Sequence, residues 1–101
     1  MAEAAWKRHE REVARLLGGR RQPNTGRRSA DVLAPRWAIE VKLRRQLPLW
    51  LLEAIAQAEA AARGTERLPL LVLVVPQGRG RRPLRLAIIR LETLAQLLNE
   101  H

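Results

Sequence analysis

Hydrophobic positions recur at helical spacing from Trp6 to Leu17, which predicts an amphipathic helix over residues 2–17. The pair Gly18-Gly19 follows and is a typical signal for the end of a helix. At ~100° per residue, Glu10 falls within about 60° of Trp6. Glu10 is therefore expected on the apolar face of this helix.

The next segment alternates between apolar and polar residues, as a half-buried strand does. A short extended piece at residues 20–23 and a loop at 24–29 precede a predicted strand at 30–34. After a tight turn at Pro35-Arg36, residues 37–43 alternate strictly. One face of that strand carries its large apolar residues, and the opposite face carries Ala38, Glu40 and Lys42.

The second half of the chain predicts a helix, two strands and a final helix. Pro48 precedes a helix over 49–63, which Gly64 ends. Residues 69–76 contain a continuous apolar run, typical of a central strand covered on both faces. A strand over 84–90 and a helix over 91–99 complete the order α-β-β-β-α-β-β-α. We expect one α/β domain over residues 1–101, with a mixed central sheet flanked by helices.

Composition narrows the class of protein. A length of 101 residues allows one domain with a small core, and a hydrophobic fraction of 47% is that of a globular chain. The absence of cysteine excludes a disulfide scaffold and a thiol nucleophile. No run of eighteen apolar residues and no signal peptide is visible, so we expect no membrane association and a cytoplasmic location, in the host cytoplasm if the source is a phage.

The charge pattern points to a polyanionic partner. The chain carries 19 Lys+Arg against 10 Asp+Glu, a formal net charge of +9. Residues 18–45 hold eight bases against two acids, and residues 79–90 hold five arginines and no acid. Nucleic acid is the commonest partner of such a surface. Without Phe or Tyr in the chain, single-strand binding by base stacking is not expected.

The rarest charged residues gather around one predicted strand. Asp31 is the one aspartate, and Lys42 is one of two lysines beside seventeen arginines. Glu40 and Lys42 are predicted side by side, and a short turn brings Asp31 next to Glu40. Paired carboxylates suit a hard cation such as Mg²⁺, which can polarise a phosphodiester and activate water, while a lysine stabilises the developing charge.

These residues resemble the PD-(D/E)xK nuclease signature. The likeness is strongest to Holliday-junction resolvases of archaeal type and their small phage relatives, and it covers roughly residues 6–62 together with a predicted fourth strand at 69–76. Ala30 stands at the position of the name-giving proline. The resemblance implies a restriction-endonuclease-like core and a homodimer that cuts four-way DNA junctions in recombination and repair with Mg²⁺, for which Mn²⁺ substitutes. It assigns catalytic and metal-binding roles to Glu10, Asp31, Glu40, the carbonyl of Val41, Lys42 and Gln57.

A basic rim is expected to bind DNA phosphates around this site. Its predicted members are Arg20, Arg21, Thr25, Arg27, Arg28, Ser29, Arg44 and Arg45. Arg79, Arg81 and Arg82 have two possible roles that the sequence leaves open: they form a second contact with DNA, or they keep a hairpin loop soluble.

Simpler interpretations and other functions stay open as well. Glu40 and Lys42 can form a salt bridge on an exposed strand, Glu10 and Gln57 can be solvated helix residues, and the arginines a solvated rim. The alternatives to a junction resolvase are another nuclease of the superfamily (nicking, repair or restriction-like), a non-catalytic DNA-binding module, and an RNA-binding accessory protein.

Overall fold

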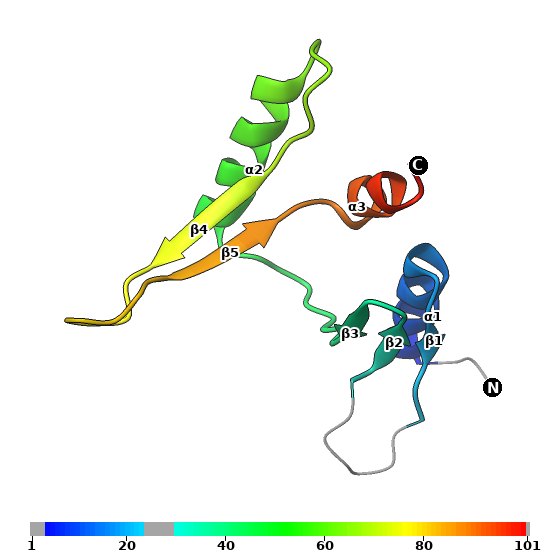
Figure 1. Cartoon of the computed structure of the whole chain (residues 1–101). Helices are drawn as coiled ribbons and strands as arrows, with labels where there is room; N and C mark the ends of the chain where they lie inside the picture. The colour runs from blue at the N-terminus through cyan, green and yellow to red at the C-terminus, as the bar shows by residue number, and fades with distance from the viewer. Residues whose placement is uncertain (1–3, 24–29, 101) are drawn as a thin grey trace. The chain divides into compact units, whose positions relative to one another are not determined.

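The computed structural model describes residues 4–23 and 30–100 (Figure 1). The elements in chain order are α1 (Ala5–Leu17), β1 (Arg20–Arg21), β2 (Val32–Ala34), β3 (Trp37–Ile39), α2 (Leu49–Ala62), β4 (Leu71–Val75), β5 (Leu84–Ile88) and α3 (Leu91–Leu98). The predicted order α-β-β-β-α-β-β-α is confirmed. The chain forms two compact units: unit 1 combines Met1–Arg45 with Leu94–His101, and unit 2 is Gln46–Thr93.

Two glycines shape the end of α1 in unit 1, as predicted. Gly18 has φ 68° in the left-handed region, which favours glycine. The Gly19 N–H donates to the Ala14 carbonyl at 2.8 Å. A Cβ on Gly19 would lie 2.5 Å from the Leu33 carbonyl oxygen, so the absent side chain lets the backbone approach β2 closely. The pair ends the helix and turns the chain into the sheet.

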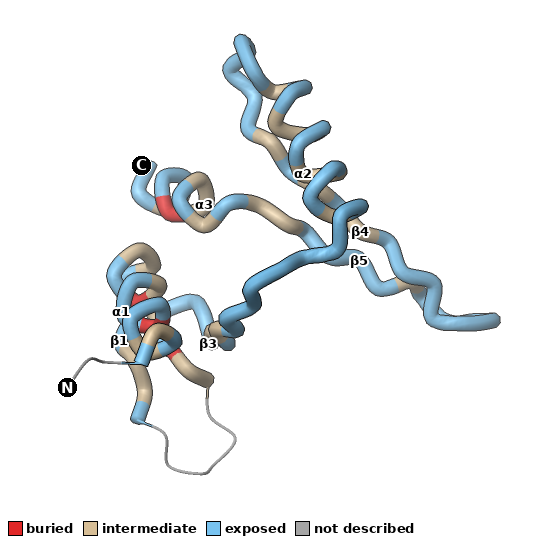
Figure 2. Tube along the Cα trace, turned by 180° about the vertical axis from the view of Figure 1, so that it is seen from behind, coloured by how far each residue is buried: buried red, intermediate tan, exposed pale blue. Residues whose placement is uncertain are grey.

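The sheet of unit 1 has the order β1-β2-β3 and is antiparallel throughout. Helix α1 packs on β1 and β2, and its buried residues Glu10 and Ala14 lie one turn apart. Val32 is fully buried. Figure 2 colours the buried residues red; all of them (Glu10, Ala14, Val32 and Ala95) belong to unit 1.

The strand predicted over 37–43 is shorter in the structure and ends at Ile39. Val32 pairs with Ile39, so continued pairing would bring Val41 opposite residue 30. The Val41 N–H donates instead to the Asp31 side chain. The ladder therefore ends where a carboxylate replaces a backbone acceptor, and the segment from Glu40 to Leu43 is not part of a strand.

Unit 2 consists of α2 and the antiparallel hairpin β4–β5, in register from Leu71 opposite Ile88 to Val75 opposite Leu84. The prediction that β4 is a central strand covered on both faces is not met within unit 2. There β4 pairs with β5 alone, and Val72 and Val74 are 51% and 56% exposed. The apolar run gives the strand two apolar faces, and the small unit covers only one of them with α2.

The α/β class is confirmed, but the described residues form two small antiparallel sheets where one mixed sheet was expected. The single domain stays a prediction. Among the described residues, no helix is both long enough and apolar enough to span a bilayer.

Candidate functional site

Asp31 is joined to the Glu40-Val41-Lys42 segment by a direct hydrogen bond. The residue lies immediately before β2, and its Oδ2 accepts the Val41 N–H at 2.8 Å. The turn at Pro35-Arg36 brings the two segments together, as the sequence predicted. One oxygen of Asp31 is thereby fixed against the motif backbone.

Glu40 and Lys42 lie close together, although they follow β3 and are not part of it. The Lys42 Nζ is 3.9 Å from a Glu40 carboxylate oxygen, and the side chains are 68% and 57% exposed, respectively. A loose ion pair in water contributes little to stability. Both groups can therefore turn toward a ligand at small cost.

Glu10 lies on the buried face of α1, as its position in the helical pattern predicted. It is 6% exposed and is the one buried charged residue among those described. Its Oε1 accepts a hydrogen bond from the Arg21 Nε at 2.6 Å, and the Arg21 guanidinium also lies over the Trp6 ring, 5.5 Å from the centroid. Sequence reasoning assigned Arg21 to DNA and missed this pairing. The only available signal was an acid on an apolar stripe, which needs a basic partner when buried.

Gln57 is exposed on α2 and belongs to unit 2, whereas the other predicted catalytic residues belong to unit 1. Its supporting role at the site stays a prediction.

The predicted DNA-binding rim is described in part. Arg20, Arg44 and Arg45 are exposed, and none of them forms an ion pair within the described ranges 4–23 and 30–100. Arg44 donates to the Leu43 carbonyl at 2.9 Å. The other predicted contacts, Thr25, Arg27, Arg28 and Ser29, lie outside the described residues.

The donor set fits a hard cation in its chemistry. Asp31 and Glu40 offer carboxylate oxygens and Val41 a backbone carbonyl, and Mg²⁺ takes one or two carboxylates together with water and phosphate oxygens. Among the residues that the structure describes, no three acidic or histidine side chains are gathered into a metal-binding group. Glu10 is bound to Arg21 instead. Its predicted place in the metal shell stays a prediction.

The buried Glu10–Arg21 pair predicts that two glutamates of the same helix contribute very differently to the free energy of unfolding. Replacing Glu10 by glutamine leaves a part-buried guanidinium without its counter-charge, and we expect this to lower the free energy of unfolding by about 1–3 kcal/mol. Glu12→Gln is the matched control because Glu12 pairs with Arg15 on the exposed surface. Urea unfolding should shift for Glu10→Gln and stay unchanged for Glu12→Gln. Equal midpoints for both variants would contradict the buried pair.

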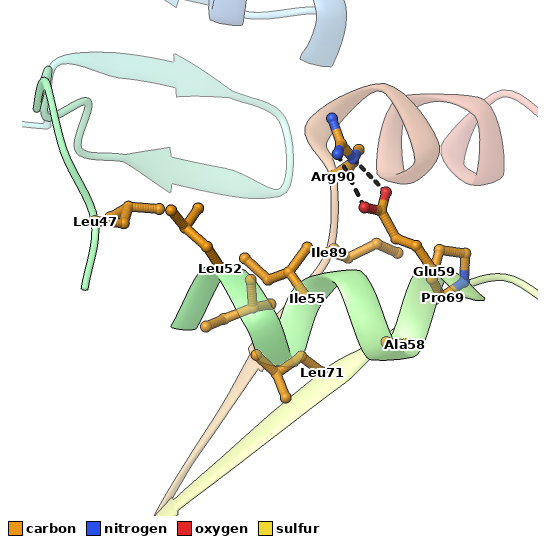
Figure 3. Close-up of a pocket in the computed structure, with 10 residues that line it drawn as sticks. Leu47, Leu52, Ile55, Ala58, Glu59, Pro69, Leu71, Ile89 and Arg90 are labelled. Atoms are coloured by element: carbon orange, nitrogen blue, oxygen red, sulfur yellow. Dashed lines mark hydrogen bonds and ion pairs between the residues drawn. The ribbon is translucent and has the colours of Figure 1, made fainter. Parts of the chain in front are cut away.

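Unit 2 contains an apolar pocket of about 310 Å³ between α2 and the hairpin, and an ion pair is part of its lining (Figure 3). The Arg90 Nε and Nη2 donate to the two oxygens of Glu59 at 2.6 and 3.0 Å. These hydrogen bonds hold the pKa of Glu59 below its ordinary value of 4.5, and the charge of Arg90 and then that of Arg63 act in the same direction. Apart from this pair, the pocket lining is apolar.

A lowered pKa in the folded state predicts a loss of stability in acid. The contribution of the Glu59 carboxylate is present above its ordinary pKa of 4.5 and disappears as the pH falls through the lower folded value. Thermal unfolding of Glu59→Gln should therefore depend less on pH below 4.5 than that of the wild type. Glu53→Gln, on the exposed face of the same helix, is the control and should follow the wild type. Identical curves for wild type and Glu59→Gln would contradict the assignment.

Comparisons of the chain with protein-family models, with curated proteins and with solved structures find no match.

Proposed function

We propose that the chain is a metal-dependent, structure-selective DNA endonuclease that resolves four-way junctions. The observation that carries the proposal is the hydrogen bond from the Val41 N–H to Asp31, which joins the aspartate to the Glu40-Val41-Lys42 segment. The loose Glu40–Lys42 ion pair contributes little to stability, so stability alone does not explain the presence of two acids and a lysine in this part of a strongly basic chain. Phosphodiester hydrolysis would use the two acids to bind a metal ion and the lysine to stabilise negative charge.

Asp31, Glu40 and the Val41 carbonyl are the groups that would hold Mg²⁺ or Mn²⁺. The bound ion would supply Lewis acidity toward a phosphate oxygen and make water more acidic. The Oδ2 of Asp31 is fixed by the Val41 N–H, so its other oxygen keeps a defined direction. Lys42 brings a compact, exposed ammonium that stabilises negative charge on the phosphate or on the attacking water.

Glu10 orients this arrangement from the buried face of α1. Its pairing with Arg21 fixes the helix against β1, the strand that pairs with the one following Asp31. The exposed arginines Arg20, Arg44 and Arg45 bind backbone phosphates without reading sequence. In this proposal the buried charged pair supports the structure of the site, whereas the exposed arginines bind the DNA.

A homodimer completes the proposal. Two cuts related by a two-fold axis are needed to resolve a symmetric junction, and a chain this small gains stability by burying a face. We expect analytical ultracentrifugation to give a dimer at micromolar concentration, and two protomers on each junction. A monomer in both the free and the junction-bound state would contradict the dimer.

The experiment that tests the activity compares labelled four-way junction, flap, mismatch and plain duplex as substrates in Mg²⁺. Paired cuts confined to the junction would support a resolvase. Equal cutting of all four substrates would retain a nuclease and reject junction selectivity. Preferential cutting of flap or mismatch would favour a repair or nicking enzyme.

A non-catalytic DNA-binding module is the second candidate. It is favoured by the exposed arginines of both units that form no ion pair within residues 4–23 and 30–100, namely Arg20, Arg44, Arg45, Arg79, Arg81 and Arg82. Such a module would bind DNA equally well with and without chelator, and would tolerate Asp31→Asn and Lys42→Ala. Tight binding without any cutting in Mg²⁺ and then in Mn²⁺ would select it.

A further inference from the structure

The loop between β4 and β5 carries a group of arginines that the proposed active site does not use. Arg79, Arg81 and Arg82 lie in this loop and Arg85 lies on β5, and all four are exposed. No side chain of these four arginines forms a hydrogen bond or ion pair with any residue in the ranges 4–23 and 30–100. We call residues 76–85 the hairpin arm.

Arg90 differs from these four arginines because its side chain has an acidic partner. Arg90 is the fifth arginine of the basic segment and is neutralised by Glu59. No acidic residue occurs between Glu66 and Glu92, so the arm holds four positive charges with no acid beside them in the sequence. Their mutual repulsion costs free energy unless an anion is bound. Charges of both signs would keep a loop soluble equally well, so solubility alone does not explain four positive charges without an acid.

Two glycines with positive φ lie in the turn of the arm. Gly78 and Gly80 have φ 109° and 76°, and the Arg81 N–H donates to the Gly78 carbonyl at 3.1 Å. Positive φ values of this kind favour glycine, so the turn requires these residues. Within unit 2, the turn lies at the opposite end of the hairpin from the loop that joins α2 to β4 (Figure 1). The arginines are therefore presented at the end of a two-stranded ribbon.

The chemistry of the arm favours duplex DNA over other polyanions. Arginine forks match phosphate oxygens, and the major groove of DNA admits a two-stranded ribbon. Between Val75 and Leu84 there is no large apolar side chain to insert into a membrane. No aromatic residue follows Trp50, so the arm offers no stacking platform for single-stranded bases.

We propose that the hairpin arm is a second DNA contact, which binds backbone phosphates of a duplex through Arg79, Arg81 and Arg82, with Arg85 behind them. The inference rests on the DNA substrate of the proposed function and does not depend on cleavage.

The test measures fluorescence anisotropy of a labelled 30-base-pair duplex against salt concentration, with EDTA present so that binding is separated from cutting. For R79A/R81A we expect affinity to fall about tenfold or more at 0.1 M salt. The slope of log K against log salt should decrease by about 2, since each lost phosphate contact removes about 0.9. R79K/R81K keeps the charge and should retain the wild-type slope. R63A/R67A removes two exposed arginines from the other end of the same unit and should leave both quantities unchanged.

Several outcomes would contradict the proposed DNA contact of the hairpin arm. These are a wild-type slope for R79A/R81A, an equal loss for R63A/R67A, the absence of duplex binding by the wild type, or an effect confined to structured RNA or to anionic vesicles. Junction cleavage by the same proteins, in Mg²⁺ and at saturating concentration, separates the two proposals. Binding that depends on the arm without any cutting rejects the nuclease alone. Cutting with a wild-type slope for R79A/R81A rejects the arm alone.

Discussion

Asp31→Asn is expected to lower the rate of junction cleavage by about 10³-fold, the upper end of the range for the loss of one charge-stabilising group, while junction binding is kept. The asparagine retains an oxygen that can accept the Val41 N–H, so the link to the Glu40-Val41-Lys42 segment survives. It lacks the negative charge that a hard cation requires. Single-turnover cleavage and anisotropy binding on the same preparation measure the two effects.

Asp31→Ala separates charge from structure at this position. Alanine removes both the charge and the hydrogen bond, so we expect loss of cleavage together with a lower unfolding midpoint, whereas Asp31→Asn should lose cleavage alone. Mn²⁺ binding, followed by electron paramagnetic resonance, should weaken in both variants. Wild-type cleavage by Asp31→Asn would contradict the assigned role.

Lys42→Ala is expected to lower kcat by about 10²–10³-fold with little change in KM, because the ammonium acts on charge that develops during the reaction. The side chain is 68% exposed, so folding should be unaffected. Lys42→Arg should restore only part of the rate, since a planar guanidinium does not replace a compact ammonium.

Lys7 provides the control, because it is the only other lysine of the chain. It lies on α1 against the Trp6 ring, with Nζ 5.4 Å from the centroid. Lys7→Ala should therefore leave kcat unchanged. An equal loss of kcat for both variants would indicate a general effect of charge and would contradict a specific role for Lys42.

Local signals predicted most of the elements. The end of α1 follows from Gly18 and Gly19, one of which has a positive φ while the other allows close approach to β2. The start of α2 after Pro48 and its end before Gly64 follow from the conformational preferences of proline and glycine. These residues act through their own backbones, so their effects can be read without knowing the rest of the fold.

Features that depend on contacts between distant segments were harder to predict. The alternation over residues 37–43 is sound as a pattern, but the strand ends at Ile39 because Asp31 captures the Val41 N–H. The apolar run of β4 indicated two covered faces, and unit 2 covers only one. Pairing between Glu10 and Arg21 joins residues eleven positions apart and leaves no periodic trace.

The candidate site was predictable where a short connection constrains it. Asp31 and Val41 are ten residues apart and are joined through a tight turn, so their contact follows from the short connection. The loose Glu40–Lys42 pair joins residues only two positions apart, so it too follows from the local sequence. Gln57 is separated from them by a long segment, and its role depends on tertiary packing that spacing cannot specify.

The most direct test of the central claim is cleavage of a labelled four-way junction beside its matched linear duplex, with Mg²⁺ or with EDTA, by wild type and by Asp31→Asn. The proposed function predicts paired cuts in the junction that require Mg²⁺, are absent from the duplex and are lost in Asp31→Asn. Binding of the junction with no cut in Mg²⁺, or cuts that persist equally in EDTA and in Asp31→Asn, would contradict it.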